Sequence, residues 1–439
     1  MELKNLMQNA GMVGAGGAGF PSYAKISGGL KTLLINGAEC EPLLYTDYIL
    51  LKNEMTYILT GIEAVADACG INECLLCIKL HTAKRLSLAE GEALSDKVKI
   101  KVLPDVYPIG DEVSLTYQAT GRLIQPGTLP STVGVIVYNV ETMYNLGIAL
   151  RLGKPVTHKW LTVGGETPHT YVVRVPIGVR VCDLFDRLGI KVPEGYSVID
   201  GGPSMGKLIR YETAAVTKTT KGLLLLPDSC RAVESKRINE RAAVARAETA
   251  CCQCTRCTDM CPRHLLGFPL EPHKMVRTAM GAVEVMPVLI TSATLCCGCG
   301  ICENLACSQG ISPKAVINNF KAILAKNKMR YTSTDTVSPA PEREYRMIPS
   351  VKWASDLGVA KYDTVPDIIT EISDFKRLDI PLGRHIGAPS QPTVSDGDYV
   401  CEGDVIAAAA VGLSVPQHAP MAGRVTVLSD KIIIDRVEE

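Results

Sequence analysis

Hydrophobic and polar positions in the first 150 residues follow the block pattern of an α/β fold. Apolar runs predict buried strands at 33–35, 74–80, 99–103 and 135–138. A longer pattern over 46–69 predicts a helix. Polar turns follow three of these strands, and α/β folds bind ligands beyond the carboxyl ends of their strands.

The pattern changes after residue 150. A β-rich segment has expected strands at 172–175 and 179–181, a helix starting over 184–188 and a tight turn at 201–206. Two helical patterns, 241–250 and 314–328, then flank a cysteine-rich stretch. A Ser/Thr/Pro segment at 331–340 predicts a linker before a helix at 346–357. From 381, glycines separate short strands. We therefore divide the chain into five units: 1–150, 151–230, 231–330, 331–380 and 381–439.

Charge and hydropathy exclude several classes of protein. Of the 439 residues, 46 are Lys or Arg and 46 are Asp or Glu, so no net charge attracts nucleic acid or membrane phosphates. Five Phe and two Trp leave little for base stacking. No apolar run approaches the roughly 20 residues of a membrane helix, and the N-terminus lacks a signal-peptide core. We expect a cytoplasmic protein with no transmembrane segment.

Eight of the 17 cysteines fall into two nested runs. The first reads C-x2-C-x2-C-x3-C-P, the ferredoxin spacing for a 4Fe-4S cluster. The second repeats it with x4 in the last interval and Ser308 in place of proline. In two-cluster ferredoxins the fourth cysteine of each run ligates the other cluster. That pattern implies two 4Fe-4S clusters, one held by Cys251, Cys254, Cys257 and Cys307 and one by Cys296, Cys299, Cys302 and Cys261.

Other cysteines and two histidines near these runs receive structural interpretations. Cys252 and Cys297 each adjoin a ligand, and we expect them to pack near a cluster as small apolar residues, with a ligand swap as the alternative. His264 and His273 are expected on the surface or in packing. The C-x2-C pair at 74 and 77 lies in a predicted strand, so we expect core residues there and not a redox pair.

A glycine-rich loop spans residues 14–19, with Lys25 shortly after it. Closely spaced glycines let backbone N–H groups approach a phosphate, although a flexible turn is the alternative. The loop does not fit the Rossmann fingerprint, because no strand is expected before it.

Four loops in this order resemble those of the flavin-binding subunit of respiratory complex I and of its relative RnfC. They read G-A-G-G-A-G-F-P, N-G-A-E-C-E-P, Y-P-I-G-D-E and N-V-E-T, within 11–145. The resemblance implies that glycines and a lysine hold FMN: Gly14, Gly16, Gly17, Gly19 and Lys25. It implies that six more residues line the flavin and NADH site, with Glu39 and Glu112 as the catalytic candidates: Asn36, Glu39, Glu41, Glu112, Asn139 and Thr142.

Two positions depart from that resemblance. Ala15 stands where complex I has Arg, and Asp111 precedes Glu112 where complex I has a second Glu. Both changes affect side chains expected near phosphate or NADH. FMN therefore remains the firmer expectation of the two ligands.

The remaining units also resemble known domains. Residues 151–230 resemble an SLBB β-grasp domain, and 381–439 resemble a biotinyl/lipoyl-like barrel sandwich. Carriers of biotin or lipoate need a Lys on an exposed hairpin turn, expected here near 416–422, which has none. We expect a non-acylated docking module. The predicted fold class is thus multidomain α/β and β: a complex-I-flavin-subunit-like domain, a β-grasp domain, a helical ferredoxin-like two-cluster domain and a C-terminal barrel sandwich.

This domain order resembles the PduS-type cobalamin reductases of propanediol-utilisation microcompartments, whereas RnfC carries its barrel sandwich first. The resemblance covers nearly the whole chain. It implies electron transfer from NADH, through FMN and two 4Fe-4S clusters, to cobalamin, taking cob(III)alamin towards cob(II)alamin and cob(I)alamin for adenosylcobalamin regeneration. The partners it implies are cobalamin, an adenosyltransferase and microcompartment shell proteins, with a location inside a microcompartment.

Three alternatives stay open: an RnfC-like subunit feeding a membrane complex, a subunit feeding another soluble reductase, and an electron-transfer module with a degenerate flavin site. The N-terminus has two interpretations as well. Leu3, Leu6 and Met7 form one face of a short helix, which suits an encapsulation signal or, as we prefer, the first helix of the flavin domain.

Overall fold

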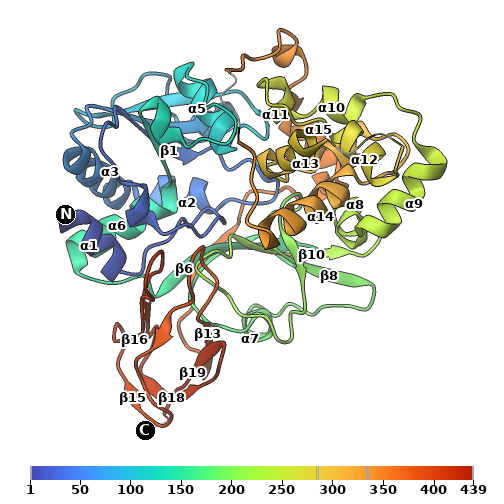
Figure 1. The fold of residues 1–439 in the computed structure, drawn as a ribbon. Helices are drawn as coiled ribbons and strands as arrows, with labels where there is room; N and C mark the ends of the chain where they lie inside the picture. Colours follow the sequence, from blue (N-terminus) through green and yellow to red (C-terminus); the bar gives the residue numbers. More distant parts are fainter. Residues whose placement is uncertain (1, 283, 285, 333–335, 438–439) are drawn as a thin grey trace.

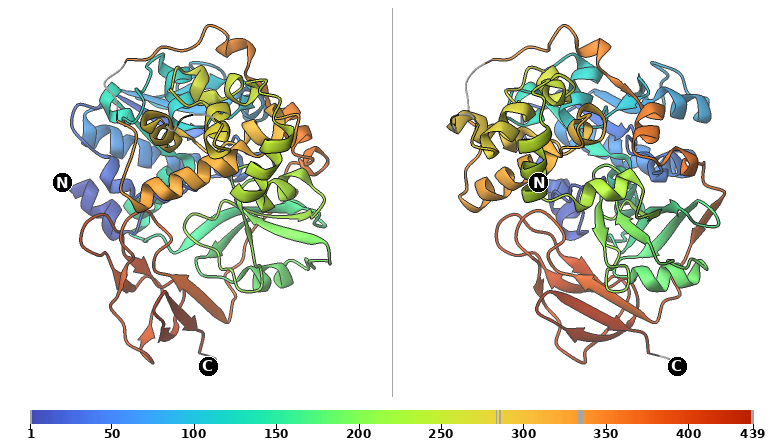
Figure 2. Two further views of the ribbon diagram at one scale, coloured as in Figure 1. Left: turned by 45° about the vertical axis from the view of Figure 1, so that its right-hand side comes forward. Right: turned by 90° about the vertical axis from the view of Figure 1, so that its right-hand side faces the viewer.

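The chain folds into an N-terminal α/β unit, a helical cysteine-rich unit and two β-rich units (Figure 1). The computed structural model describes residues 2–282, 284, 286–332 and 336–437. The α/β and cysteine-rich units lie side by side, with the β6–β10 sheet beneath them and the C-terminal strands at the far end (Figures 1 and 2). None of the described helices is long and apolar enough to cross a membrane.

A four-stranded parallel sheet forms the centre of the N-terminal unit, in the order β3-β2-β1-β5. Its strands are β1 (Thr32–Gly37), β2 (Glu73–Lys79), β3 (Val98–Leu103) and β5 (Val135–Asn139). The predicted strands are therefore confirmed. Leu33, Leu34 and Ile35 are fully buried, because helices cover both faces of a parallel sheet. Cys74 and Cys77 are buried in β2, as expected.

Six helices accompany this sheet: α1 (Glu2–Asn9), α2 (Thr46–Asn53), α3 (Met55–Cys69), α4 (Leu80–Leu86), α5 (Glu112–Thr120) and α6 (Val140–Leu152). The expected helix over 46–69 is two helices, because Glu54 leaves helical geometry. Helices α3 and α6 pack closely, since a Cβ at Gly61 or Gly147 would collide with a carbonyl oxygen of the other helix.

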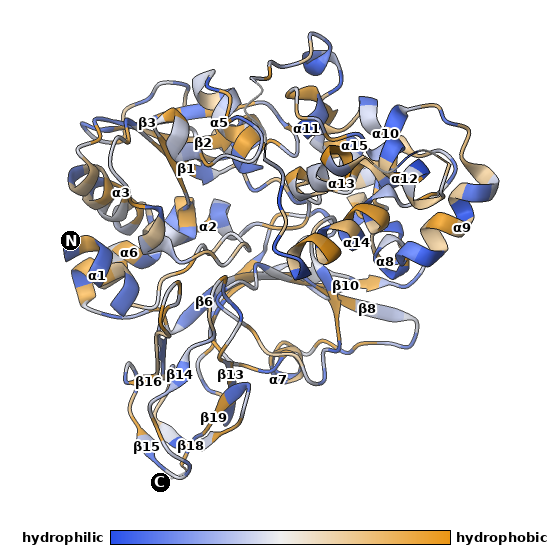
Figure 3. Cartoon of the chain, viewed as in Figure 1, coloured by the Kyte–Doolittle hydropathy of each residue, from blue (hydrophilic) through white to orange (hydrophobic). Residues whose placement is uncertain are grey.

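The first helix packs on the N-terminal unit. Helix α1 carries apolar and polar residues (Figure 3). Met7 is fully buried, and Leu3 and Leu6 pack against the same core. This is the role we preferred for the N-terminal segment.

The second sheet has the order β12-β7-β6-β10-β8-β9. It contains β6 (His158–Gly165), β7 (Tyr171–Pro176), β8 (Tyr196–Asp200), β9 (Lys207–Ile209) and β10 (Gly222–Pro227), with α7 (Val181–Arg187) beside it. The expected strand at 179–181 is wrong. Val179 and Arg180 form only isolated bridges, and Val181 begins α7. Val179 is fully buried, so its apolar character reflects core packing without a ladder.

Short helices surround the two cysteine runs: α8 (Arg231–Arg237), α9 (Glu240–Ala250), α10 (Arg256–Asp259), α11 (Pro262–Leu265), α12 (Pro272–Ala279), α13 (Pro287–Thr291) and α14 (Pro313–Lys326). Ser312 caps α14 by accepting a hydrogen bond from the Ala315 N–H. The helices expected at 241–250 and 314–328 are thus α9 and α14.

The segment 331–380 does more than link. Part of the expected linker, residues 333–335, lies outside the described residues. Beyond it, β11 (Ile348–Pro349) pairs with β4 (Val106–Tyr107), α15 (Ser350–Asp356) follows, and β12 (Ile368–Glu371) extends the second sheet beside β7. The helix expected at 346–357 is shorter because its first residues pair as a strand.

The C-terminal strands form two small sheets, β13-β19-β18-β15 and β14-β16-β17. Their bounds are β13 (Arg377–Pro381), β14 (Gln391–Pro392), β15 (Tyr399–Val400), β16 (Val405–Ala408), β17 (Gln417–His418), β18 (Gly423–Val427) and β19 (Lys431–Asp435). The expectation of an exposed turn near 416–422 is wrong. Gln417 and His418 are buried, and the Pro416 carbonyl accepts a hydrogen bond from Lys218.

Candidate functional site

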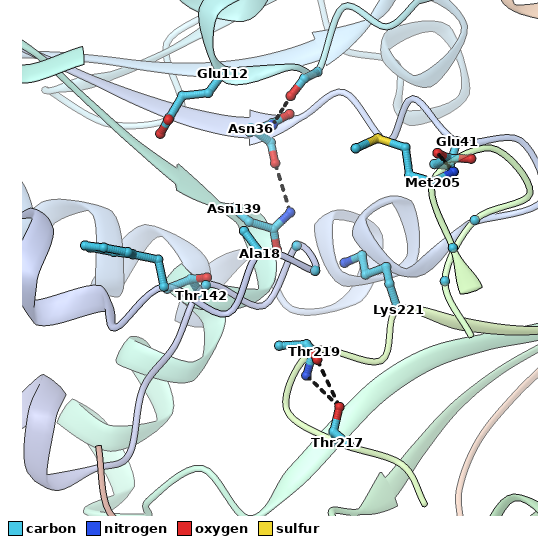
Figure 4. A pocket seen from close by; sticks show the side chains of 18 of the residues that line it. Ala18, Asn36, Glu41, Glu112, Asn139, Thr142, Met205, Thr217, Thr219 and Lys221 are labelled. Atoms are coloured by element: carbon cyan, nitrogen blue, oxygen red, sulfur yellow. Dashed lines mark hydrogen bonds between the residues drawn. The ribbon is translucent and has the colours of Figure 1, made fainter. Parts of the chain in front are cut away.

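A cavity of about 1430 Å³ opens at the carboxyl edge of the parallel sheet. Asn36 of β1 and Asn139 of β5 are paired in register there, and the Asn139 amide donates to the Asn36 carbonyl at 3.2 Å (Figure 4). Ten of the eleven predicted flavin-site residues line this cavity: Gly14, Gly16, Gly17, Lys25, Asn36, Glu39, Glu41, Glu112, Asn139 and Thr142. The exception is Gly19.

The glycine loop provides an open backbone wall. A Cβ at Gly17, where φ is +108°, would meet nothing within 4 Å, so the backbone faces free space. At Gly16 a Cβ would touch the Asn139 side chain at 3.4 Å. The Gly14 N–H donates to the Phe20 carbonyl at 2.8 Å and closes the loop on itself. Such a loop fits a phosphate group, which backbone N–H groups bind closely.

Gly19 has a different place. It has φ +66°, and a Cβ there would lie 2.8 Å from Thr219 and 3.4 Å from the His385 backbone. The Ile386 N–H donates to the Gly19 carbonyl at 2.9 Å. The C-terminal β unit thus packs directly on the tip of the glycine loop.

Lys25 is held by neighbours and is not a free cation in the cavity. Its ammonium donates to Glu112 Oε1 and to the Val137 carbonyl, both at 2.9 Å. Glu112 begins helix α5, directly after its N-cap Asp111. The two predicted residues therefore form one ion pair across the loop and the sheet.

Glu39 lies at the N-terminus of helix α2. Its two carboxylate oxygens accept hydrogen bonds from the Asp47 and Tyr48 N–H groups, at 2.9 and 3.0 Å. Burial, and then the nearby Asp47 carboxylate, raises the pKa of Glu39 to about 7. A carboxyl with this pKa changes protonation near neutral pH.

Sequence reasoning missed a buried set of charges beside Glu39. Lys221 donates to Asp47 Oδ1 at 2.5 Å and lies 3.5 Å from Glu141, which also pairs with Lys159. Lys221 lines the cavity (Figure 4). Glu141 belongs to the N-V-E-T motif. A carboxylate between apolar neighbours in the sequence was the signal that could have predicted its burial.

Glu41 joins two units. Its oxygens accept hydrogen bonds from the Ser204 and Met205 N–H groups, at 2.8 and 2.9 Å. These N–H groups belong to the expected tight turn at 201–206. Glu41 lines the cavity, yet both of its oxygens serve this contact between the first and second sheets.

The cysteines gather into two groups that mix the two runs. Cys261, from the first run, lies with Cys296, Cys299 and Cys302 around a small cavity, and we call these four the inner group. The outer group is Cys251, Cys254, Cys257 and Cys307. Its members lie close together, since burial, and then the thiolate charges of the other three, raise the pKa of Cys257. The groups match the crossed sets expected from the ferredoxin pattern. Among the described residues no three His, Cys, Asp or Glu side chains are grouped to hold a single metal ion.

The inner group is the more buried one. Burial raises the pKa of the Cys261 thiol to about 12, and it raises the pKa of the Cys302 thiol well above its ordinary value. Cys254 of the outer group is exposed. Five cysteines line this small cavity: the four of the inner group and Cys297. Such a set of thiols fits a 4Fe-4S cluster, whose irons stabilise the thiolate form that burial alone disfavours.

Three family models match the chain in separate parts. The Nuo51 FMN-binding domain matches residues 7–147, a 4Fe-4S dicluster domain matches 250–312, and the RnfC barrel sandwich hybrid domain matches 357–436. An FMN-binding domain and a dicluster domain are therefore present, and the expected barrel sandwich is confirmed.

Over its whole length the chain is similar to cobalamin reductase PduS of Salmonella typhimurium. The two are 36% identical over 434 residues, which cover 98% of this chain and 96% of that protein. The chain belongs to the PduS cobalamin reductase family. The PduS of Citrobacter freundii is equally similar, at 36% identity over 434 residues.

A more distant relative is a component of the ion-translocating oxidoreductase complex of Rhodobacter capsulatus. It is 32% identical over 284 residues, covering 63% of this chain and 52% of that protein. A chain of an NAD⁺-reducing [NiFe]-hydrogenase in the H₂-reduced state has a TM-score of 0.46 and 19% identity over 73% of this chain and 61% of that chain.

Proposed function

We propose that this PduS family member is an NADH-dependent cobalamin reductase that uses FMN and two 4Fe-4S clusters. One observation carries the proposal: Cys297 lines both the large cavity with the flavin-type loops and the small cavity of the inner cysteine group. A site for a two-electron carrier therefore shares a wall with a site for a one-electron carrier. The identity to PduS over 98% of the chain supports cobalamin as the acceptor.

FMN is assigned to the large cavity. When bound, it supplies the exchange between two-electron and one-electron transfer. The backbone of 14–17 would hold its phosphate, and Asn36, Asn139 and Thr142 would offer polar groups to the rest of the molecule. Thr142 is oriented by the Ala15 N–H, which donates to its hydroxyl at 3.1 Å. Glu39 and Glu112 remain the catalytic candidates, because both line the cavity and Glu39 holds or releases a proton near neutral pH.

The clusters are assigned to the two cysteine groups, with one 4Fe-4S cluster in each. The volume of the large cavity, about 1430 Å³, supports a second ligand beside FMN, which we assign as NADH. The mixed sheet with α7 on it supports the SLBB β-grasp assignment for 151–230, and we keep the five-unit division, with β12 added to the β-grasp sheet.

Membership of the PduS family supports a proposal for partners and location. We propose that an adenosyltransferase receives the reduced cobalamin, that shell proteins are neighbours and that the protein works inside a microcompartment. Helix α1 serves the flavin domain in this proposal, because its apolar face packs on that domain.

An anaerobic titration tests the function. The full-length protein is reconstituted with iron, sulfide and FMN, and NADH is added while flavin and cluster absorbance are followed. Cob(III)alamin is then added. We expect NADH to bleach both chromophores, and cobalamin to restore them as cob(II)alamin appears.

The other outcomes each identify the part that fails. Bleaching by NADH without reoxidation by cobalamin would favour an RnfC-like subunit or a donor to another soluble reductase. If FMN is retained but NADH does not bleach it, another electron donor must be sought, and Ala15 and Asp111 are the positions to test. Failure to retain FMN would favour the electron-transfer module with a degenerate flavin site.

A further inference from the structure

A polar contact joins the wall of the large cavity to the inner cysteine group. Asp111 lines the large cavity, and Arg263 lines the small cavity together with Cys261, Cys296 and Cys299. Arg263 Nη2 donates to Asp111 Oδ1 at 2.7 Å. The two residues are 152 positions apart in sequence, so only the fold brings them together.

The pair is buried and held on several sides. The Arg263 and Asp111 side chains are 13% and 11% exposed. Asp111 also caps helix α5, accepting from the Ser114 N–H at 3.3 Å and its hydroxyl at 3.1 Å. The guanidinium lies over the Phe268 ring, 5.3 Å from its centroid. Because water is largely excluded, the charges of the pair act strongly on what lies beside them.

One nitrogen of Arg263 is evidence for a bound group. Its Nε is buried and makes no hydrogen bond of good geometry within the described residues, although the Cys297 thiol lies beside the guanidinium. A buried N–H without an acceptor is costly, and such groups are rare in folded proteins. A sulfur of a cluster in the adjoining cavity is an acceptor of the required kind.

Two lysines near the inner group already have hydrogen-bond or ion-pair partners. Lys314 lines the small cavity as well, but its ammonium lies 3.3 Å from Glu303. Lys321 donates to the Cys296 carbonyl at 3.0 Å. Arg263 thus places a buried N–H and a positive charge beside Cys297 and the inner group, while Asp111 offers the compensating negative charge.

We propose that the Asp111–Arg263 pair sets the reduction potential of the cluster in the inner group. Net charge and hydrogen bonds to sulfur are main determinants of cluster potential. The guanidinium favours the reduced, more negative cluster and raises the potential, and the Asp111 carboxylate limits that rise. The inference rests on the proposed cluster ligation, and it does not depend on the identity of the acceptor.

Potentials of charge variants test this inference. The full-length protein is reconstituted anaerobically and titrated against redox mediators, with each cluster followed by EPR. Cys254→Ser, at the exposed cysteine of the outer group, alters one signal and so assigns the unaltered signal to the inner group. We expect Arg263→Gln to lower the inner potential and Asp111→Asn to raise it. Arg263→Lys should keep most of the wild-type value, and the double variant D111N/R263Q should return towards it.

Opposite signs distinguish charge from disturbed packing, because damage to the fold has no reason to reverse with the sign of the lost charge. Arg256→Gln is the matched control, since it removes an exposed arginine from the same cysteine run and should leave the inner potential unchanged. Shifts of the same sign in R263Q and D111N, or no shift in either, would overturn the inference. Iron analysis that finds a single cluster per wild-type chain would instead show that the proposed ligation has failed.

Discussion

Residue by residue, the charges beneath the large cavity are unequal in number. Three carboxyl groups (Glu39, Asp47 and Glu141) face two buried lysines (Lys159 and Lys221). Because removing a charge from water is costly unless it is paired, one carboxyl is expected to take up a proton. Glu39 is that group, since burial raises its pKa to about 7.

This predicts a pH dependence for Glu39. In the unfolded chain Glu39 releases its proton near its ordinary pKa of 4.5, whereas the folded protein keeps the proton until about pH 7. The folded state therefore binds more protons in that window, and the contribution of Glu39 to stability declines as pH rises through it. The full effect is a few kcal/mol, since each pKa unit corresponds to about 1.4 kcal/mol.

We expect Glu39→Gln, which cannot ionise, to flatten this part of the stability profile. The measurement is the thermal unfolding midpoint from pH 4.5 to 8 at constant FMN. Glu194→Gln, on the exposed surface, is the control and should leave the profile unchanged. Parallel profiles for the wild type and Glu39→Gln would show that Glu39 keeps an ordinary pKa in the fold.

Between elements, the glycine loop and the C-terminal β unit depend on one another. The Gly19 carbonyl accepts a hydrogen bond from the Ile386 N–H. Gly19 also has a left-handed φ, and a Cβ there would lie only 2.8 Å from the Thr219 side chain. Glycine adopts this conformation without the steric penalty that a Cβ brings.

Gly19→Ala should therefore displace both the loop and the barrel segment. We expect roughly 10-fold weaker FMN binding, which corresponds to about 1.4 kcal/mol. The measurement is the FMN dissociation constant by fluorescence titration of the deflavinated protein. Gly28→Ala is the control, because a Cβ there would meet nothing within 4 Å. Equal FMN affinity in both variants would contradict the role of Gly19.

Across the whole molecule, the segment 331–380 holds three units together. Trp353 of α15 is fully buried and stacks on Tyr107, with ring centroids 4.7 Å apart. Its indole N–H donates to the Ser204 hydroxyl at 2.8 Å, and the Tyr107 hydroxyl donates to the Cys299 carbonyl at 2.8 Å. The first sheet, the second sheet and the inner group therefore meet at one aromatic pair.

Trp353→Phe should loosen this junction. The variant leaves a void and removes the donor to Ser204, at a cost of about 2 kcal/mol. We expect a lower thermal midpoint and faster loss of iron to a chelator. Trp160→Phe is the matched control, because it shortens the same kind of ring and leaves the bond from Trp353 to Ser204 intact. If iron is lost to the chelator no faster than in the control variant, Trp353 does not stabilise the cysteine groups.

Local patterns in the sequence determined much of this protein. Apolar runs defined the four parallel strands, because burial of both sheet faces leaves a continuous apolar signal. The glycine loop, the two cysteine runs and the short Gly-separated strands were also visible, since backbone freedom and ligand spacing are properties of neighbouring residues.

The tertiary structure alone decided which distant residues meet. Glu41 could be placed near a sheet edge, but its use by Ser204 and Met205 depends on a turn 163 residues away. The pairing of Asp111 with Arg263, the burial of Gln417 and the place of β12 in the second sheet are of the same kind. Contacts between separate units produce no local sequence pattern, because each residue type is also compatible with the helix, strand or turn in which it lies.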